Sequence, residues 1–221
     1  MKLKKLLCLV LVCLVLCGCG KTKAGGNMEL ALSSLLWEDY AVALAESEAF
    51  LKRMPENTDA QAIRESAAWS MLRTAQLEIE LPDGTYRQTD YGFVVENLPE
   101  KGRSDVQITG YWVGMDHSRE TISDKDVETY FLRSITIYWT DGSGAAYTYD
   151  LQSPQTLRAK DLGKTILANP YSGDTMDQET VEALADQAKK VVVPSLKEIF
   201  KQIEKETALT PEQLGFASWK G

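Results

Sequence analysis

The chain has 221 residues, 32 of them acidic and 24 basic, and a formal net charge of −8. A surface of that sign repels phosphate backbones, so we expect no nucleic-acid partner. The only histidine is His117, which excludes metal sites and catalytic mechanisms that need two imidazoles. All four cysteines lie at or before residue 19. The rest of the chain therefore cannot form an internal disulfide and must rely on its core.

The N-terminus has the organisation of an export signal. Lys2, Lys4 and Lys5 give a basic start, and an unbroken apolar run follows at 6–16. This run of about eleven residues is short, because a helix that spans a bilayer needs roughly 20. A basic start, a short apolar run and a small residue before the cleavage point are typical of a secretory signal peptide. We predict that residues 1–18 are this peptide.

Leu16-Cys17-Gly18-Cys19 resembles the lipobox of bacterial lipoproteins, in which an aliphatic residue and two small residues precede an invariant cysteine. Cys17 departs from the smaller residue that is commoner at its position. The resemblance implies cleavage after Gly18, a diacylglycerol thioether on Cys19, and a site for acylation of the freed amine. Two or more acyl chains hold a protein stably on a bilayer. The resemblance therefore implies a lipid anchor at the cell membrane, on the extracytoplasmic face. The alternative is an ordinary secretory signal with chance cysteines.

After Cys19 the sequence predicts a Gly-rich tether at 19–27 and a single domain at 28–221. Apolar residues at steps of three and four predict an amphipathic helix from Met28 to Met54, with Asn27 as its N-cap.

A second helix is predicted to begin at Thr58, after Pro55, and to present Ile63 and Ala67 on its apolar face. The short connection between the two helices predicts an antiparallel helical hairpin.

From Leu77 onward the apolar period changes to two, which is typical of half-buried strands. The polar stretch 116–129 is predicted to be a loop with one helical turn from Ser123, and Asp141-Gly142-Ser143-Gly144 a hairpin loop. The predicted strands are 77–81, 86–95, 106–115, 131–139 and 145–151.

The C-terminal part predicts a long helix from Thr175 to about Ile203. Pro194 lies inside it and either kinks one helix or begins a second; the apolar face stays in phase through the proline, which favours a kink. A short helix from Thr210 would bring Phe216 and Trp219 back onto the core.

These elements predict an α+β fold with an N-terminal helical hairpin, an antiparallel sheet of about five strands, and a long C-terminal helix packed on the sheet. Helices that precede a curved sheet are similar to the nuclear-transport-factor-2-like fold, which often encloses a pocket. The extra C-terminal helix departs from that pattern.

Aromatic residues on the predicted strands are the candidate binding surface. Tyr111, Tyr138, Tyr147 and Tyr149 fall on neighbouring strands and, if exposed, would form a platform for sugar, peptide or lipid. Core packing is the commoner role of aromatic residues in sheets, and alternation places Trp139 in the core.

The sequence contains no nucleophile motif, phosphate-binding glycine loop or metal-ligand pattern, so we assign no catalytic residue, cofactor or metal. We predict a non-catalytic lipoprotein that binds a ligand or a partner, a protein or glycan of the cell envelope. The alternative is a surface hydrolase or transferase with a carboxylate-based site. A deep cleft lined by paired carboxylates would favour the enzyme, and a flat aromatic patch the binding protein.

Overall fold

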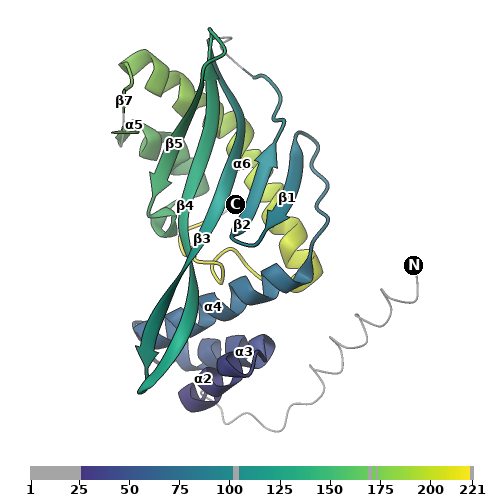
Figure 1. The fold of residues 1–221 in the computed structure, drawn as a ribbon, viewed down its shortest axis with the longest axis vertical. Coiled ribbons are helices and arrows are strands. Elements are labelled where there is room, and N and C mark those ends of the chain that lie inside the picture. The colour runs from purple at the N-terminus through teal and green to yellow at the C-terminus, as the bar shows by residue number, and fades with distance from the viewer. Residues whose placement is uncertain (1–25, 102–104, 169–170, 173, 220–221) are drawn as a thin grey trace, which may run out of the picture.

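The structure is a computed structural model that describes residues 26–101, 105–168, 171–172 and 174–219. The predicted signal peptide and the predicted lipidation site Cys19 lie outside the described residues. Three helices, a five-stranded antiparallel sheet and a long final helix follow one another along the chain, which confirms the predicted α+β class (Figure 1).

The sheet is an antiparallel meander in the order β1-β2-β3-β4-β5. Its strands are β1 (Thr85–Thr89), β2 (Gly92–Glu96), β3 (Val106–Ile122), β4 (Lys125–Asp141) and β5 (Ala146–Gln152). The helices are α2 (Met28–Leu36), α3 (Tyr40–Leu51), α4 (Thr58–Ala75), α5 (Leu162–Ala168) and α6 (Gln178–Thr207). The short pieces are the 3-10 turns η1 (Pro154–Thr156) and η2 (Ala159–Asp161) and the strand pair β6 (Tyr171–Ser172) and β7 (Asp174–Thr175).

The prediction of one helix over 28–54 is wrong, because a short turn separates two helices, α2 and α3. Glu38 has a left-handed φ of 60°. Asp39 then caps α3 by accepting a hydrogen bond from the N–H of Val42 at 3.4 Å. The apolar spacing stays helical across this break, so periodicity alone cannot detect it. Asn27 caps α2 as predicted, accepting from the N–H groups of Glu29 and Leu30.

Two of the predicted strands are also wrong. The segment 77–81 pairs with no strand; its backbone is held by the side-chain amide of Gln202, which accepts from the N–H of Glu80 at 3.2 Å and donates to the carbonyl of Glu80 at 2.7 Å. The predicted strand 86–95 is the hairpin β1–β2, which turns at Asp90 and Tyr91. The alternation in 77–81 still places Ile79 in the core.

The stretch 116–129 is a two-stranded ribbon in place of the predicted loop and helical turn. Ser123 and Asp124 form its tight turn, with φ values of 49° and 62°. We call residues 116–131 the arm, because they extend β3 and β4 beyond the end of β5 and lie across α4 (Figure 1). Few side chains of the arm are buried, among them Ile122 and Val127. A ribbon with one covered face needs few apolar residues, so its sequence has the composition of a loop.

Helix α4 takes the place of a strand neighbour for β4 where β5 ends. The N–H of Tyr130 donates to Ser66 Oγ at 3.2 Å, and the N–H of Leu132 donates to Glu65 Oε1 at 2.6 Å. The amide of Gln155 donates to the carbonyl of Leu132 at 2.7 Å. Side chains thus satisfy backbone groups that would otherwise be buried without partners.

Helix α6 covers one face of the sheet, and it runs through Pro194 without interruption, as the phase of its apolar face indicates. The hydroxyls of Tyr111 on β3 and Ser195 on α6 form a buried hydrogen bond of 2.8 Å. Gln187 on α6 accepts from the N–H of Ile108 at 2.9 Å and donates to the carbonyl of Val106. These polar contacts fix α6 along β3.

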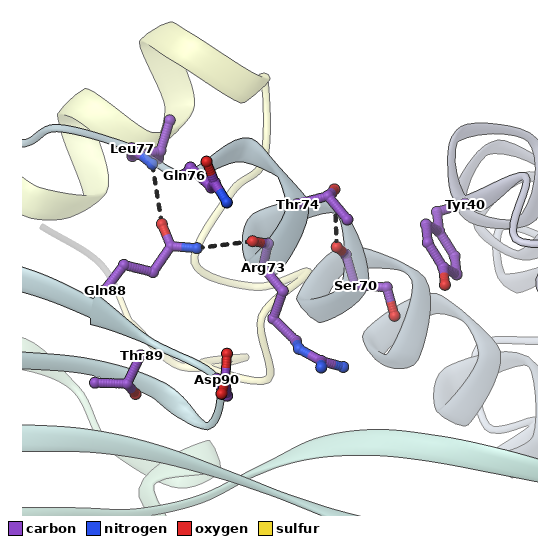
Figure 2. A pocket seen from close by; sticks show the side chains of 9 residues that line it. All are labelled: Tyr40, Ser70, Arg73, Thr74, Gln76, Leu77, Gln88, Thr89 and Asp90. Atoms are coloured by element: carbon purple, nitrogen blue, oxygen red, sulfur yellow. Dashed lines mark hydrogen bonds between the residues drawn. The ribbon is translucent and has the colours of Figure 1, made fainter.

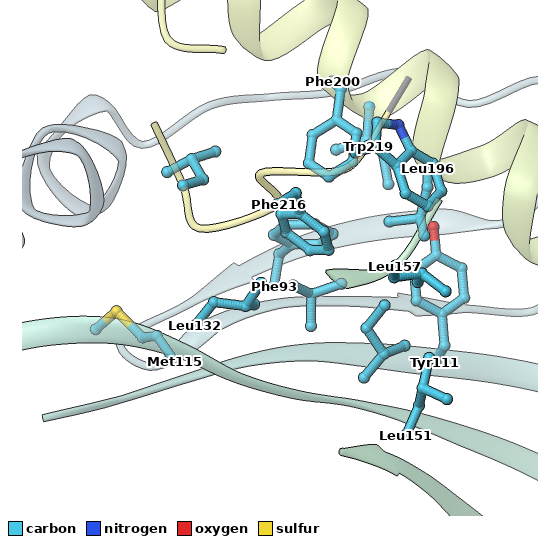
Figure 3. Close-up of a cluster of buried hydrophobic side chains, with 14 of the residues drawn as sticks. Phe93, Tyr111, Met115, Leu132, Leu151, Leu157, Leu196, Phe200, Phe216 and Trp219 are labelled. Carbon is cyan, nitrogen blue, oxygen red and sulfur yellow. The ribbon is translucent and has the colours of Figure 1, made fainter. Parts of the chain in front are cut away.

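The C-terminal segment returns to the core, as predicted. Phe216 and Trp219 contact Phe200 edge-to-face, with centroids 5.0 and 5.5 Å apart (Figure 3). The predicted short helix that precedes them is a turn, closed by a hydrogen bond of 2.9 Å from the N–H of Phe216 to the carbonyl of Pro211.

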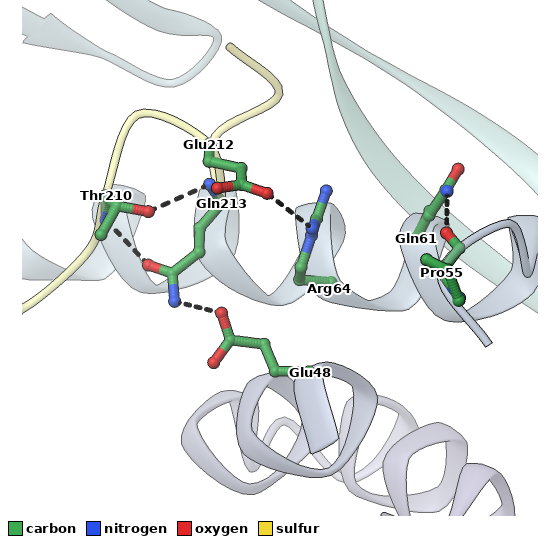
Figure 4. Close-up of polar contacts among 7 residues, drawn as sticks. All are labelled: Glu48, Pro55, Gln61, Arg64, Thr210, Glu212 and Gln213. Carbon is green, nitrogen blue, oxygen red and sulfur yellow. Dashed lines mark hydrogen bonds and ion pairs between the residues drawn. The ribbon is translucent and has the colours of Figure 1, made fainter. Parts of the chain in front are cut away.

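The same segment connects the helical layer to the rest of the molecule. The side chain of Gln213 donates to Glu48 on α3 at 2.5 Å and accepts from the N–H of Thr210 at 2.8 Å (Figure 4). Glu212 forms an ion pair of 3.9 Å with Arg64 on α4. Both helices are therefore tied to the turn that follows α6.

Candidate functional site: a polar cavity between α4 and the first hairpin

A polar cavity lies where the C-terminal half of α4 faces the β1–β2 hairpin (Figure 2). Its volume of about 670 Å³ is within the range usual for small-molecule sites. Almost every lining residue carries a polar side chain. The lining consists of Tyr40, Ser70, Arg73, Thr74, Gln76, Leu77, Gln88, Thr89 and Asp90.

Gln88 builds one wall by capping the end of α4. Its amide nitrogen donates to the carbonyls of Leu72 and Arg73 at 2.8 and 3.0 Å, and its oxygen accepts from the N–H of Leu77 at 3.0 Å. The helix ends because Gln76 has a left-handed φ of 47°. One side chain on β1 thus provides hydrogen-bond partners for two carbonyls and one N–H at the end of α4.

On the same hairpin, the turn at Asp90 and Tyr91 continues this wall and is fixed against β3. The N–H of Met115 donates to the carbonyl of Tyr91 at 3.0 Å. Gly92 follows with a φ of 121°, and a Cβ there would lie 2.0 Å from the carbonyl oxygen of Val113. Only glycine permits this close approach, so the position of Asp90 at the cavity depends on Gly92.

Arg73 and Asp90 are the two charged residues of the lining. The guanidinium of Arg73 lies over the ring of Tyr130 on the arm, 4.8 Å from its centroid. Within the part of the chain that the structure describes, neither Arg73 nor Asp90 forms a hydrogen bond or an ion pair through its charged group. By contrast, Arg133 on β4 pairs with Asp116 at 3.0 Å. The cavity therefore presents a guanidinium that forms no ion pair with a described carboxylate, and the Asp90 carboxylate lines the same cavity.

Two hydroxyls on the helical side complete the polar lining. In Figure 2, the side chains of Tyr40 and Ser70 point toward each other. Burial and then the Glu38 carboxylate raise the pKa of the Tyr40 phenol, and the Ser70 side chain and Arg73 oppose that rise. The phenol is therefore a neutral donor and acceptor at neutral pH. Thr89, on the hairpin side, has a buried hydroxyl with no hydrogen-bond partner among the described residues.

A row of aromatic rings continues from the cavity along the arm. The ring of His117 lies between Tyr91 and Tyr130, with centroid distances of 6.5 and 6.2 Å. Its Nε2 is 3.7 Å from a carboxylate oxygen of Glu128. The histidine therefore lies on a strand beside the cavity, whereas the sequence predicted a loop.

The four tyrosines of the predicted platform do not share an exposed face. Tyr111 and Tyr149 are fully buried, and the hydroxyl of Tyr149 donates to the carbonyl of Ile166 at 3.1 Å. Tyr147 is exposed and stacks on the buried Trp139 at 4.6 Å, whereas Tyr138 lies on the other face and is partly buried. Tyr111 and Tyr149 therefore belong to the core, which was the alternative to a binding platform. Buried neighbours on α5 and α6 cover them.

A buried carboxylate lies elsewhere. Burial raises the pKa of the Glu65 carboxyl, and the Leu132 N–H and the Arg64 charge offset only part of that rise. Glu65 does not line the cavity, where Asp90 is the one carboxylate among the described lining residues.

No group of three or more His, Cys, Asp or Glu side chains in the described ranges is placed to hold a metal. None of the helices described is both long and apolar enough to cross a bilayer.

Comparisons with protein-family models, with curated proteins and with solved structures found no match to this chain.

Little in the sequence indicates this cavity. Arg73 appears as an ordinary charged residue on a helix, and Gln88 and Asp90 fell inside a predicted continuous strand. The one local signal was Asp90-Tyr91-Gly92, because Asp and Gly within an apolar–polar alternation are typical of a turn.

Proposed function

We propose that the protein is an extracytoplasmic lipoprotein, anchored to the cell membrane through Cys19, whose folded part binds a small anionic ligand in the cavity at Arg73. The anchor rests on the lipobox resemblance at residues 16–19. Binding rests on one observation: a cavity of about 670 Å³ contains a guanidinium with no ion pair among the described residues.

The chemistry of the lining favours a carboxylate- or phosphate-bearing molecule with further polar groups. A guanidinium presents paired N–H donors that match the oxygens of either anion. The face of Tyr130 already covers one side of the Arg73 guanidinium, so an anion would approach its edge. Tyr40 and Ser70 supply hydroxyls, and Asp90 accepts hydrogen bonds from a ligand amine or hydroxyl. Acidic sugars of envelope glycans and amino-acid derivatives belong to this class.

The anchor is tested by replacing the cysteine that carries it. We expect Cys19→Ser to abolish incorporation of a labelled fatty acid and to move the protein out of the membrane fraction. A variant that stays labelled and membrane-bound would show that the lipid is not on Cys19. Cys17→Ser is the matched control and keeps both label and location.

Ligand binding is tested by thermal unfolding in the presence of a panel of small anions. The panel comprises dicarboxylates, N-acylated amino acids, phosphorylated sugars and acidic sugars. A ligand at 100 times its Kd stabilises a folded protein by about 2.7 kcal/mol, which raises the Tm of a chain of this size by roughly 5–10 °C. We expect at least one member to give such a shift and Arg73→Gln to abolish it.

Two further variants separate lost recognition from lost structure. Arg73→Lys keeps the positive charge but not the paired donors, and we expect it to weaken the shift. Arg133→Gln removes an arginine that is already paired with Asp116, and should leave the shift intact. If no anion shifts the Tm, or if Arg73→Gln and the parent respond alike, the cavity is not the site. Turnover of ester, peptide or glycan substrates would instead favour the alternative enzyme.

A further inference from the structure

The first helix presents an apolar face that no described element covers. Leu30 and Leu36 are each 43 % exposed, and Trp37 at the end of α2 is 85 % exposed. Their neighbours on the opposite side, Ala31 and Leu35 among them, are buried against the helical layer. In Figure 1, α2 lies at the end of the molecule away from the β4–β5 turn.

The chain enters the folded part immediately beside this face. The carbonyl of Gly26 accepts from the Arg53 guanidinium at 2.9 Å, and the N–H of Asn27 donates to the buried carboxylate of Glu46 at 2.8 Å. Gly26 also has a φ of +63°, and a Cβ there would lie 2.3 Å from the backbone nitrogen of Phe50. Residues 26 and 27 were predicted to be tether, but they are fixed to α3.

The distance from the proposed anchor to this face is therefore short. Seven peptide units separate Cys19 from Gly26, and at about 3.6 Å each they reach at most about 25 Å. Helix α2, with nine residues, is about 14 Å long at 1.5 Å per residue. An anchor at Cys19 holds the whole exposed face of α2 within reach of the lipid surface.

We infer that the outer face of α2, formed by Leu30, Leu36 and Trp37, lies on the lipid bilayer, with Trp37 in the headgroup region. This inference rests on the proposed lipid anchor. Tryptophan is enriched at that depth because its ring is apolar and its N–H is polar. Residues 28–51 contain no Lys or Arg; Glu29 lies on the same exposed side of α2, and Glu38 and Asp39 follow the helix directly. Contact is therefore driven by apolar burial and does not require anionic lipid.

The experiment uses the full lipidated chain reconstituted into phosphatidylcholine vesicles, some of whose acyl chains carry bromine as a fluorescence quencher. Lipidation is measured independently, by mass spectrometry. Of the other four tryptophans, Trp69, Trp139 and Trp219 are buried, and Trp112 on β3 is half-buried. We expect a loss of tryptophan emission in the parent that disappears in Trp37→Phe, and no increase in that loss when phosphatidylglycerol is added.

A second variant tests the orientation. In the Trp37→Phe background, Tyr147→Trp places a probe at an exposed position near the β4–β5 turn, and we expect its emission to be unquenched. Equal quenching in parent and Trp37→Phe, with the lipid present, overturns the inference and leaves the anchor intact. Absence of lipid on Cys19 overturns both. Pairing of two copies through this face, seen as a dimer that Trp37→Asp dissociates, also overturns it.

Discussion

The contact between α6 and the sheet and the junction between α4 and the first hairpin are held together by different means. The first is mostly apolar: Ile199, Leu196 and Phe216 are fully buried there. Its buried polar contacts are those of Gln187 and the Tyr111–Ser195 pair. At the second, side-chain amides and hydroxyls bond to backbone groups, as Gln88 does at the end of α4. In both regions a helix packs on strands, but apolar packing dominates the first and side-chain hydrogen bonds to the backbone dominate the second.

The difference explains where the cavity lies. Apolar side chains close-pack and leave few voids, so the α6 contact has little room for a ligand. At the α4 junction, the backbone groups are satisfied by single long side chains, which hold the elements apart at a fixed distance. Polar groups such as Arg73 can then face an open space without being buried against apolar atoms.

The largest effect should come from breaking the apolar contact. Ile199 is fully buried on α6, and Ile199→Ala removes its apolar contacts and leaves a cavity. We expect the free energy of unfolding to fall by about 2–5 kcal/mol, measured by denaturant titration. Lys197→Ala, at an exposed position of the same helix, is the control and should change it by less than about 0.5 kcal/mol. An equally small loss for Ile199→Ala would show that α6 is not packed on the sheet.

The next effect should come from the polar junction. Gln88→Leu has similar size but leaves the Leu72 and Arg73 carbonyls and the Leu77 N–H without their partner. We expect a loss of about 1–3 kcal/mol, the cost of an unsatisfied buried group, together with faster hydrogen exchange at the last turn of α4. Gln178→Leu, an exposed glutamine on α6, serves as the reference. Unchanged exchange at α4 in Gln88→Leu would argue against the capping role.

The smallest effect concerns Glu65, and its sign depends on pH. Because burial raises the pKa of this carboxyl in the folded state, ionisation destabilises the fold. The penalty is absent below the pKa of an unfolded glutamate, about 4.3, and develops as the pH rises through the folded-state pKa. Glu65→Gln stays neutral and still accepts from the Leu132 N–H. We expect equal free energies of unfolding near pH 4 and a more stable variant at pH 7; a gap that is independent of pH would contradict this.

The same contrast explains what the sequence could predict. The α+β class, the long helix through Pro194 and the return of Phe216 and Trp219 follow from apolar periodicity, which records burial. The division of the first helix at Glu38, the hairpin turn at Asp90 and the arm at 116–131 do not. In these places polar side chains or left-handed residues determine the path, and they leave no period in the sequence.

Residues at the cavity were missed for the same reason. A glutamine that caps a distant helix, as Gln88 does, has the same local sequence context as one on a solvent-facing strand. The unpaired state of Arg73 depends on which carboxylates the fold brings near it, and that is a property of the tertiary structure. The tyrosines were over-interpreted because alternation assigns a face but not what covers it, and α6 covers Tyr111.

We propose Arg73 as the anion-binding group of the cavity, and side-chain NMR observes binding at this residue itself. The Nε–Hε resonances of the arginines, assigned with Arg73→Lys and Arg133→Lys, are followed while inorganic phosphate, acetate and the strongest anion of the thermal panel are titrated in. We expect saturable shifts of the Arg73 resonance at ligand concentrations that leave the Arg133 resonance unchanged. Equal, non-saturating shifts of both resonances would mean that the cavity has no anion site, and would contradict the proposal.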